Sequence, residues 1–249
     1  MHLCGGDFQT TCRVLADGFR PTGAGLLFPP DRTPGERRRP FEELAAQYAV
    51  PSSANWQKAR DYLVETRKLD PALVDELHEK GKIYANTHLP NPGIVFLHQT
   101  MDGRVAGATL RDTRHESSFR PCLGNKLSAW FSVGDLANAH TIVAVESPID
   151  ALSYHSLFIG RDRGHVVVSC SGSSVPDDLM WSAYDRRQKF IVALDNDNAG
   201  ELGWQKAWDS TTEWSGFDIS SECPRLKDWN ADLVASHRVN NGQRSSLHL

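Results

Sequence analysis

The spacing of apolar residues predicts helices in the region from 41 to about 82. One helix is predicted over 55–67, where four apolar residues recur at helical spacing and share one face: Trp56, Ala59, Leu63 and Val64. A second helix is predicted from Asp70, a suitable N-cap followed by proline at the first helical position, to Gly81. The pattern indicates a compact helical unit.

The apolar pattern then changes from helical spacing to extended runs. Residues 93–100 and 104–112 are two such runs, and Asp102-Gly103 lies between them. An Asp-Gly pair between apolar runs is typical of a β-hairpin turn. A looser stretch follows and ends at 127–133.

The last part of the chain alternates apolar runs with helical segments. Three runs rich in β-branched residues occupy 141–146, 165–172 and 189–197, and helical segments begin at Pro148 and Pro176. Continuous apolar runs are typical of strands that are buried on both faces, and the helices have the length of crossover connections. These features predict parallel strands joined by helices.

Weaker signals extend this βα alternation toward the C-terminus. A helix is predicted over 199–214, a strand over 217–221 and a closing helix over 229–238. The predicted fold class is therefore α/β, a small parallel sheet flanked by helices and preceded by a smaller α+β region.

Composition limits the classes of function. The chain has 27 Lys and Arg against 31 Asp and Glu, a formal net charge of −4, so contact with a phosphate backbone requires a local basic patch or metal ions. The run Arg37-Arg38-Arg39 is interpreted as a solvated charge cluster in a Pro- and Gly-rich linker rather than a phosphate site.

Membrane and secretory signals are not visible in the sequence. No apolar run is long enough for a membrane span, and no secretory signal is seen. The five cysteines are scattered without a Cys-x-x-Cys pair, which indicates a reducing cytoplasm and disfavours both disulfides and a zinc site.

Acidic residues follow two of the three strong strands. Glu146 ends the first run, and Asp195 and Asp197 end the third. Ligands collect at the carboxyl ends of parallel strands, and neighbouring carboxylates favour a bound Mg²⁺ or Mn²⁺. Each acid also has a simpler interpretation, since Asp197 suits a helix N-cap and Asp150 lies in a first helical turn.

Four segments in order resemble the motifs of Toprim domains of the primase type. They are VAVESPIDALS, VVVSCSGSS, IVALDNDNAG and LKDWNADL, within residues 140–235. The resemblance implies that Glu146 is the catalytic carboxylate and that Asp195, Asp197 and Asp150 bind metal. It implies supporting roles for Asp228 and Lys227. The chain has Glu-Ser-Pro where many members have Glu-Gly, and a serine cap with proline at the first helical position is expected to preserve that turn.

The hairpin before these motifs resembles the segment that precedes Toprim in bacterial primase cores. This resemblance implies that Arg111 and Lys126 bind template or nucleotide phosphates; an ordinary surface role is the alternative. Residues 1–19 resemble the closing helix of the zinc ribbon found upstream in related plasmid and mobile-element proteins, although the ribbon's ligands are absent. A plain amphipathic helix is equally consistent with this segment.

The expected organisation is an N-terminal helix and linker over 1–40, a primase-core-like α+β region over 41–138, a Toprim domain over 139–238 and a tail over 239–249. Three functions remain open: primase-like nucleotidyl transfer, a Toprim nuclease and a non-catalytic DNA-binding scaffold. None of the tyrosines has a context typical of a topoisomerase nucleophile. The expected partners are single-stranded DNA, nucleoside triphosphates, and replication or mobilisation proteins, without a membrane.

Overall fold

The computed structural model describes residues 40–246 apart from 88–92, 115–119, 137 and 159–163. The expected N-terminal helix, the linker and the arginine run at 37–39 lie outside these residues. The described part of the chain belongs to one compact unit, which begins at Arg39.

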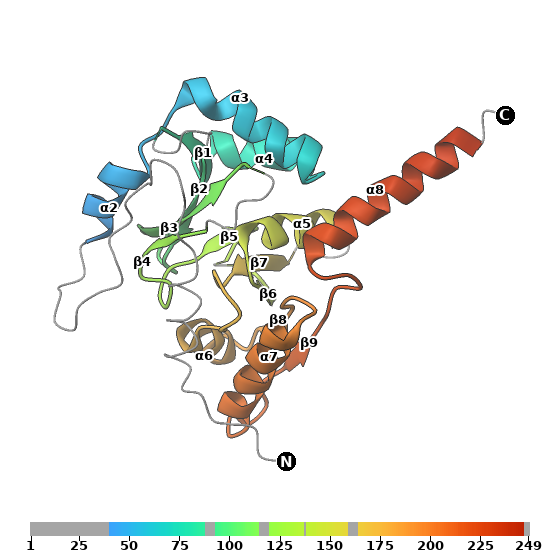
Figure 1. Cartoon of the computed structure of the whole chain (residues 1–249). Coiled ribbons are helices and arrows are strands. Elements are labelled where there is room, and N and C mark those ends of the chain that lie inside the picture. Colours follow the sequence, from blue (N-terminus) through green and yellow to red (C-terminus); the bar gives the residue numbers. More distant parts are fainter. Residues whose placement is uncertain (1–39, 88–92, 115–119, 137, 159–163, 247–249) are drawn as a thin grey trace, which may run out of the picture. The chain divides into compact units, whose positions relative to one another are not determined.

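The described residues begin with consecutive helices, continue with the strands β1 to β6, and alternate between helix and strand only after β6 (Figure 1). The helices are α2 (Phe41–Tyr48), α3 (Ser53–Asp61), the π-helix η1 (Tyr62–Thr66), α4 (Pro71–Glu79), α5 (Pro148–Phe158), α6 (Asp177–Asp185), α7 (Asn198–Thr211) and α8 (Trp229–Ser246). The strands are β1 (Ile83–Asn86), β2 (Gly93–Gln99), β3 (Val105–Asp112), β4 (Cys122–Gly124), β5 (Phe131–Val133), β6 (Thr141–Val145), β7 (His165–Ser169), β8 (Lys189–Val192) and β9 (Ile219–Ser221).

The first sheet is antiparallel, with the strand order β1-β2-β3-β4. Its centre is the predicted hairpin, in which Gly93 of β2 pairs with Asp112 of β3. The predicted helix at Asp70 also forms, and the Asp70 side chain accepts a hydrogen bond from the Ala72 amide at 2.9 Å. Strands β1 and β4 were not predicted, because segments of four and three residues carry too little periodicity to be recognised.

The second sheet has the order β5-β7-β6-β8-β9, and its last four strands are parallel, as predicted. Strand β5 is an unpredicted antiparallel edge strand beside β7. Because β6 and β8 are neighbours, with Ala144 opposite Val192, the residues that follow both strands meet at one edge of the sheet.

Apolar side chains join the two sheets in a shared core. Phe96 of β2 and Phe131 of β5 contact each other edge to face, with ring centroids 5.2 Å apart. The same cluster of buried residues includes Val143 of the parallel sheet and Trp229 of α8. The upstream region and the parallel sheet are therefore packed together rather than joined only by a linker.

The closing helix α8 begins at Trp229 as predicted and runs to Ser246, beyond the expected end at Arg238. Trp229 anchors its first turn, since its indole Nε1 donates a hydrogen bond to the Ala193 carbonyl oxygen at 2.7 Å. None of the helices that the structure describes combines the length and apolar character needed to cross a lipid bilayer.

Candidate metal and phosphate site

Glu146 and Asp195 meet at the carboxyl edge of the parallel sheet. Glu146 directly follows β6, and Asp195 follows β8 by three residues. The Asp195 amide donates a hydrogen bond to Oε1 of Glu146 at 3.4 Å. The two residues are 49 positions apart in the sequence, and the pairing of β6 with β8 brings them together.

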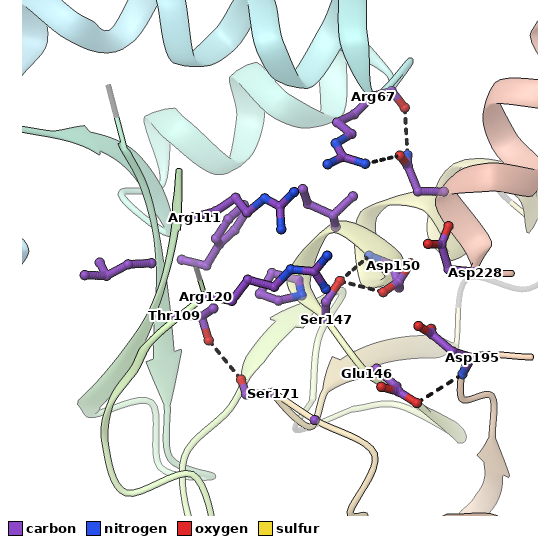
Figure 2. Close-up of a pocket in the computed structure, with 16 residues that line it drawn as sticks. Arg67, Thr109, Arg111, Arg120, Glu146, Ser147, Asp150, Ser171, Asp195 and Asp228 are labelled. Carbon is purple, nitrogen blue, oxygen red and sulfur yellow. Dashed lines mark hydrogen bonds between the residues drawn. The ribbon is translucent and has the colours of Figure 1, made fainter. Parts of the chain in front are cut away.

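A pocket of about 770 Å³, which includes space open to solvent, lies at this edge. Four carboxylates line it, those of Glu146, Asp150, Asp195 and Asp228. Three guanidinium groups also line it, those of Arg67, Arg111 and Arg120. Figure 2 shows Arg111 and Arg120 on the side toward the antiparallel sheet and Asp195 and Asp228 on the opposite side. The pocket therefore has both an acidic and a basic wall.

Asp195 is the most strongly perturbed acid of the pocket. Burial, together with the charges of Asp150 and Glu146, raises its pKa to about 8. Its Oδ1 is buried and has no hydrogen-bond partner among the described residues. An unpaired buried oxygen beside other carboxylates is unfavourable unless a proton or a cation neutralises it.

Glu146 also has a pKa above its ordinary range. Burial is the main cause, and the charges of Asp197 and Asp150 add to it, while the hydrogen bond from the Asp195 amide acts in the opposite direction. The raised pKa means that this environment favours either a proton on Glu146 or a cation shared with Asp195.

Asp150 is held in the first turn of α5 by Ser147. The Ser147 hydroxyl donates to Oδ2 of Asp150 at 2.5 Å, and the Asp150 amide donates to Oγ of Ser147 at 3.2 Å. Burial raises the Asp150 pKa to about 6, although the hydrogen bond from Ser147 acts to lower it. The Glu-Ser-Pro turn, which replaces the Glu-Gly of many Toprim domains, therefore still holds the Asp150 carboxylate at this edge (Figure 2).

Asp197 does not line this pocket. It is exposed, and its Oδ1 accepts hydrogen bonds from the Ala199 amide at 2.9 Å and the Gly200 amide at 3.0 Å, which makes it the N-cap of α7. It contributes to the acidic pocket mainly through its charge, which adds to the raised pKa of Asp195. Asp197 is thus a helix cap in the structure, and its role as a metal ligand stays a prediction.

The basic wall contains one predicted residue and two that were not predicted. Arg111 is almost completely buried, and burial lowers its pKa from the ordinary value. Arg67 and Arg120 carry no motif that could have identified them. None of these three arginines forms an ion pair within the part of the chain that the structure describes. Guanidinium groups that line a pocket without an acidic partner favour an anionic ligand.

Of the other predicted site residues, Asp228 lines the pocket and the two lysines do not. Asp228 lines the pocket at the start of α8, where its Oδ1 accepts a hydrogen bond from the Ala231 amide at 2.7 Å. Lys126 and Lys227 are exposed and do not line the pocket. The carbonyl oxygen of Lys227 accepts a hydrogen bond from the Asn196 amide at 2.8 Å, so this residue supports the loop that contains Asp195.

The acidic wall fits a divalent cation by its donor chemistry. Its ligands are carboxylate oxygens, which Mg²⁺ and Mn²⁺ prefer, and one of them is buried and unpaired. Within the described ranges, no three His, Cys, Asp or Glu side chains are already arranged around a single point as a complete metal site. This arrangement suits Mg²⁺, which usually takes one or two carboxylates and completes its shell with water and phosphate oxygens.

Comparison with known families divides the chain into two matched segments. Residues 143–233 match the Toprim-like family, and residues 61–139 match a family described as a protein of unknown function, DUF3991. The chain therefore contains a Toprim-like domain preceded by a DUF3991 region. It is also 26% identical over 168 residues to pXO2-78, an uncharacterized plasmid-encoded protein of Bacillus anthracis. The alignment covers 59% of this chain and 46% of the relative, so the chain spans less than half of that protein.

Solved structures of primases share the fold. The primase fragment of the bacteriophage T7 primase-helicase superposes with a TM-score of 0.52 at 19% identity, covering 70% of this chain and 69% of that chain. The RNA polymerase domain of Mycobacterium tuberculosis primase DnaG gives 0.52 at 18% identity, with 78% and 79% covered. A DnaG catalytic core gives 0.53 at 16% identity, with 82% and 78% covered. At these identities the similarity demonstrates a common fold.

Proposed function

We propose that this chain, which contains a Toprim-like domain, is a primase-like nucleotidyltransferase that joins nucleoside triphosphates on a single-stranded DNA template. The observation that carries the proposal is the pocket at the carboxyl edge of the parallel sheet, which combines four carboxylates with three arginines. A carboxylate wall suits divalent cations and an arginine wall suits phosphates, and nucleotidyl transfer needs both.

The carboxylates of Glu146 and Asp195 would hold Mg²⁺ or Mn²⁺, with Asp150 and Asp228 in support. A divalent ion in such a site supplies charge neutralisation for the transferred phosphoryl group and activation of the attacking oxygen. The raised pKa of Glu146 suits it to accept the proton of an attacking 3′-hydroxyl.

The arginines would bind the negative charge of the substrate. Arg111 projects from β3 of the antiparallel sheet, and Arg67 lies at the end of η1. Both belong to the region that matches DUF3991, whereas the carboxylates belong to the Toprim-like domain. In this proposal the two regions form one active site, and the upstream region supplies the phosphate-binding half.

Two observations favour nucleotidyl transfer over the nuclease alternative. The primase cores named above cover both the upstream region and the Toprim-like domain. The arginine wall also offers more phosphate contacts than hydrolysis of a single phosphodiester requires. The plasmid-encoded relative supports a role in the replication of a mobile element, where replication or mobilisation proteins would be the partners.

The proposal is tested with the full-length protein, single-stranded DNA, four labelled ribonucleoside triphosphates and Mn²⁺ or Mg²⁺. We expect short labelled oligonucleotides, and we expect their loss in Asp195→Asn but not in Asp178→Asn, which removes an exposed acid of α6 in the same domain. Shortened or nicked DNA without nucleotide incorporation would replace the proposal with a nuclease. DNA binding without either activity would replace it with a scaffold.

A further inference from the structure

The hydroxyl of Tyr62 lies between two arginines of the pocket. It accepts a hydrogen bond from Nε of Arg67 at 2.8 Å and one from Nε of Arg111 at 3.3 Å. The Tyr62 side chain is almost completely buried, and the Arg67 guanidinium also lies over its ring, 5.2 Å from the centroid. One aromatic side chain therefore contacts both cations.

The backbone around Tyr62 is unusual in a way that places Arg67 at the pocket. Residues 62–66 form a π-helix, in which the Arg67 amide donates to the Tyr62 carbonyl oxygen at 3.0 Å. The next residue, Lys68, has a left-handed backbone with a φ of 57°. Single π-turns widen a helix by one residue and occur often at functional sites, since they redirect the side chains that follow.

Asn230 of α8 holds Arg67 from the other side. Its Oδ1 accepts from Nη1 of Arg67 at 3.2 Å, and its Nδ2 donates to the Arg67 carbonyl oxygen at 2.8 Å. Tyr62 and Asn230 thus fix Nε and Nη1 of Arg67. The Arg111 side chain has no hydrogen bond to the described residues other than the one to Tyr62, so both of its terminal nitrogens remain for a ligand.

We propose that Tyr62 is a positioning residue that sets Arg67 and Arg111 as a preformed pair for phosphate groups. By accepting from the Nε atom of each arginine, its hydroxyl fixes the two guanidinium planes before the ligand binds. This inference rests on the proposed function and names the part of the upstream region that serves it. The shared chemistry is a phosphate group, which either a nucleoside triphosphate or a DNA strand supplies.

The test compares Tyr62→Phe with Tyr84→Phe in full-length protein. Both variants keep the ring and lose one hydroxyl, but the Tyr84 hydroxyl donates to the Ala49 carbonyl oxygen, and neither residue lines the pocket. Binding of inorganic tripolyphosphate and of a single-stranded oligonucleotide is measured by calorimetry without divalent metal, and melting temperatures are recorded in parallel. We expect Tyr62→Phe to weaken binding of at least one probe roughly five- to tenfold, and Tyr84→Phe to leave both unchanged.

Three further results decide the inference. In an Arg67→Ala/Arg111→Ala background, Tyr62→Phe is expected to have no further effect on binding, because the groups that it positions are gone. Loss of tripolyphosphate affinity identifies a nucleotide as the phosphate source, whereas loss confined to the oligonucleotide identifies a DNA strand. Unchanged binding in Tyr62→Phe, or no binding of either probe by the natural sequence, overturns the inference.

Failure of this inference is distinguishable from failure of the proposed function. Primer synthesis that is lost in Asp195→Asn but unaffected in Tyr62→Phe would retain the enzyme and reject the positioning role. If primer synthesis is present, Tyr62→Phe is expected to raise KM for the nucleoside triphosphate or for the DNA template, whichever the binding tests identify, and to leave kcat nearly unchanged, since the hydroxyl acts on binding rather than on the reacting atoms.

Discussion

The backbone amide of Asp195 donates a hydrogen bond to the carboxylate of Glu146 at 3.4 Å, across the carboxyl edge of the parallel sheet. This contact joins Glu146 to the loop that follows β8. Oδ1 of Asp195 has no hydrogen-bond donor among the described residues. Strand pairing therefore places these acids at one edge, where a proton or a cation has to neutralise the buried carboxylate oxygen.

Mn²⁺ binding is expected to distinguish Asp195 from Asp197. Asp195→Asn removes a carboxylate of the pocket, and we expect it to weaken Mn²⁺ binding by at least about tenfold, measured by calorimetry or electron paramagnetic resonance. Asp197→Asn is expected to change the affinity less than about threefold, because asparagine also caps helices and this side chain lies outside the pocket. A larger loss in Asp197→Asn than in Asp195→Asn would contradict this assignment.

The sequence predicted the parallel sheet because its strands are buried on both faces. Strand β6 is buried at all five positions, and such a strand needs a continuous apolar run that stands out from the rest of the chain. The acids at its end could be predicted from the same logic, since parallel strands point their carboxyl ends to one edge. Strand β5, with three residues, depends on pairing with β7 and carries no comparable signal.

The basic wall could be predicted only in part, for a different physical reason. Arg111 lies on a hairpin that the sequence predicts. Arg67 reaches the pocket because of the π-turn at 62–66, and no pattern of residues in the sequence predicts a π-turn there. Arg120 lies outside any helix or strand, so the spacing of apolar residues does not predict where its side chain points. Lys126 follows the hairpin in the sequence, but its exposed side chain is not part of the pocket lining.

The contribution of Asp195 to stability without metal is expected to fall as the pH rises from about 4 to about 8. The pKa of Asp195 is about 8 in the folded chain and near 3.8 in the unfolded chain, so the folded state binds more protons throughout this range. Raising the pH therefore favours the unfolded state, and Asp150, with a folded pKa of about 6, acts in the same direction up to that pH. Urea unfolding in EDTA at pH 5, 7 and 9 measures the effect.

The matched control for this pH dependence is Asp195→Asn, which has no proton to lose at that position. We expect its unfolding free energy to depend less on pH than that of the natural sequence between pH 5 and 9. Added Mn²⁺ is expected to reduce the loss of stability at high pH in the natural sequence, because it binds the deprotonated carboxylates. An equally steep pH dependence in the variant would show that other groups cause it.

Gly200 is expected to be essential for the position of Asp195. A Cβ atom at residue 200 would lie 2.0 Å from the carbonyl oxygen of Asp195, a contact that only movement of the backbone can relieve. Gly200→Ala is therefore expected to lower the free energy of unfolding by about 2–3 kcal/mol and to weaken Mn²⁺ binding. Gly216→Ala is the control, because it has a φ of 78° but open space around it.

The comparison of the two glycine variants separates steric contact from backbone strain. Gly216→Ala is expected to cost about 1 kcal/mol through its left-handed conformation and to leave Mn²⁺ binding unchanged. Urea unfolding and Mn²⁺ titration are measured on both. Equal losses of stability, with Mn²⁺ binding intact in Gly200→Ala, would show that the loop accommodates a methyl group without moving Asp195.

Asn230 is expected to couple the upstream region to the C-terminal helix. It is almost fully buried, and besides its two bonds to Arg67 its Nδ2 donates to Oγ of Ser153 at 3.0 Å. Asn230→Ala removes all three of these hydrogen bonds at a buried position, so we expect a loss of about 2–3 kcal/mol in urea unfolding and weaker phosphate binding through Arg67. The exposed Asn125→Ala is expected to stay within about 0.5 kcal/mol. If Asn230→Ala lost stability but kept full phosphate affinity, Arg67 would be held by Tyr62 alone, and the contact between α8 and η1 would serve folding rather than the site.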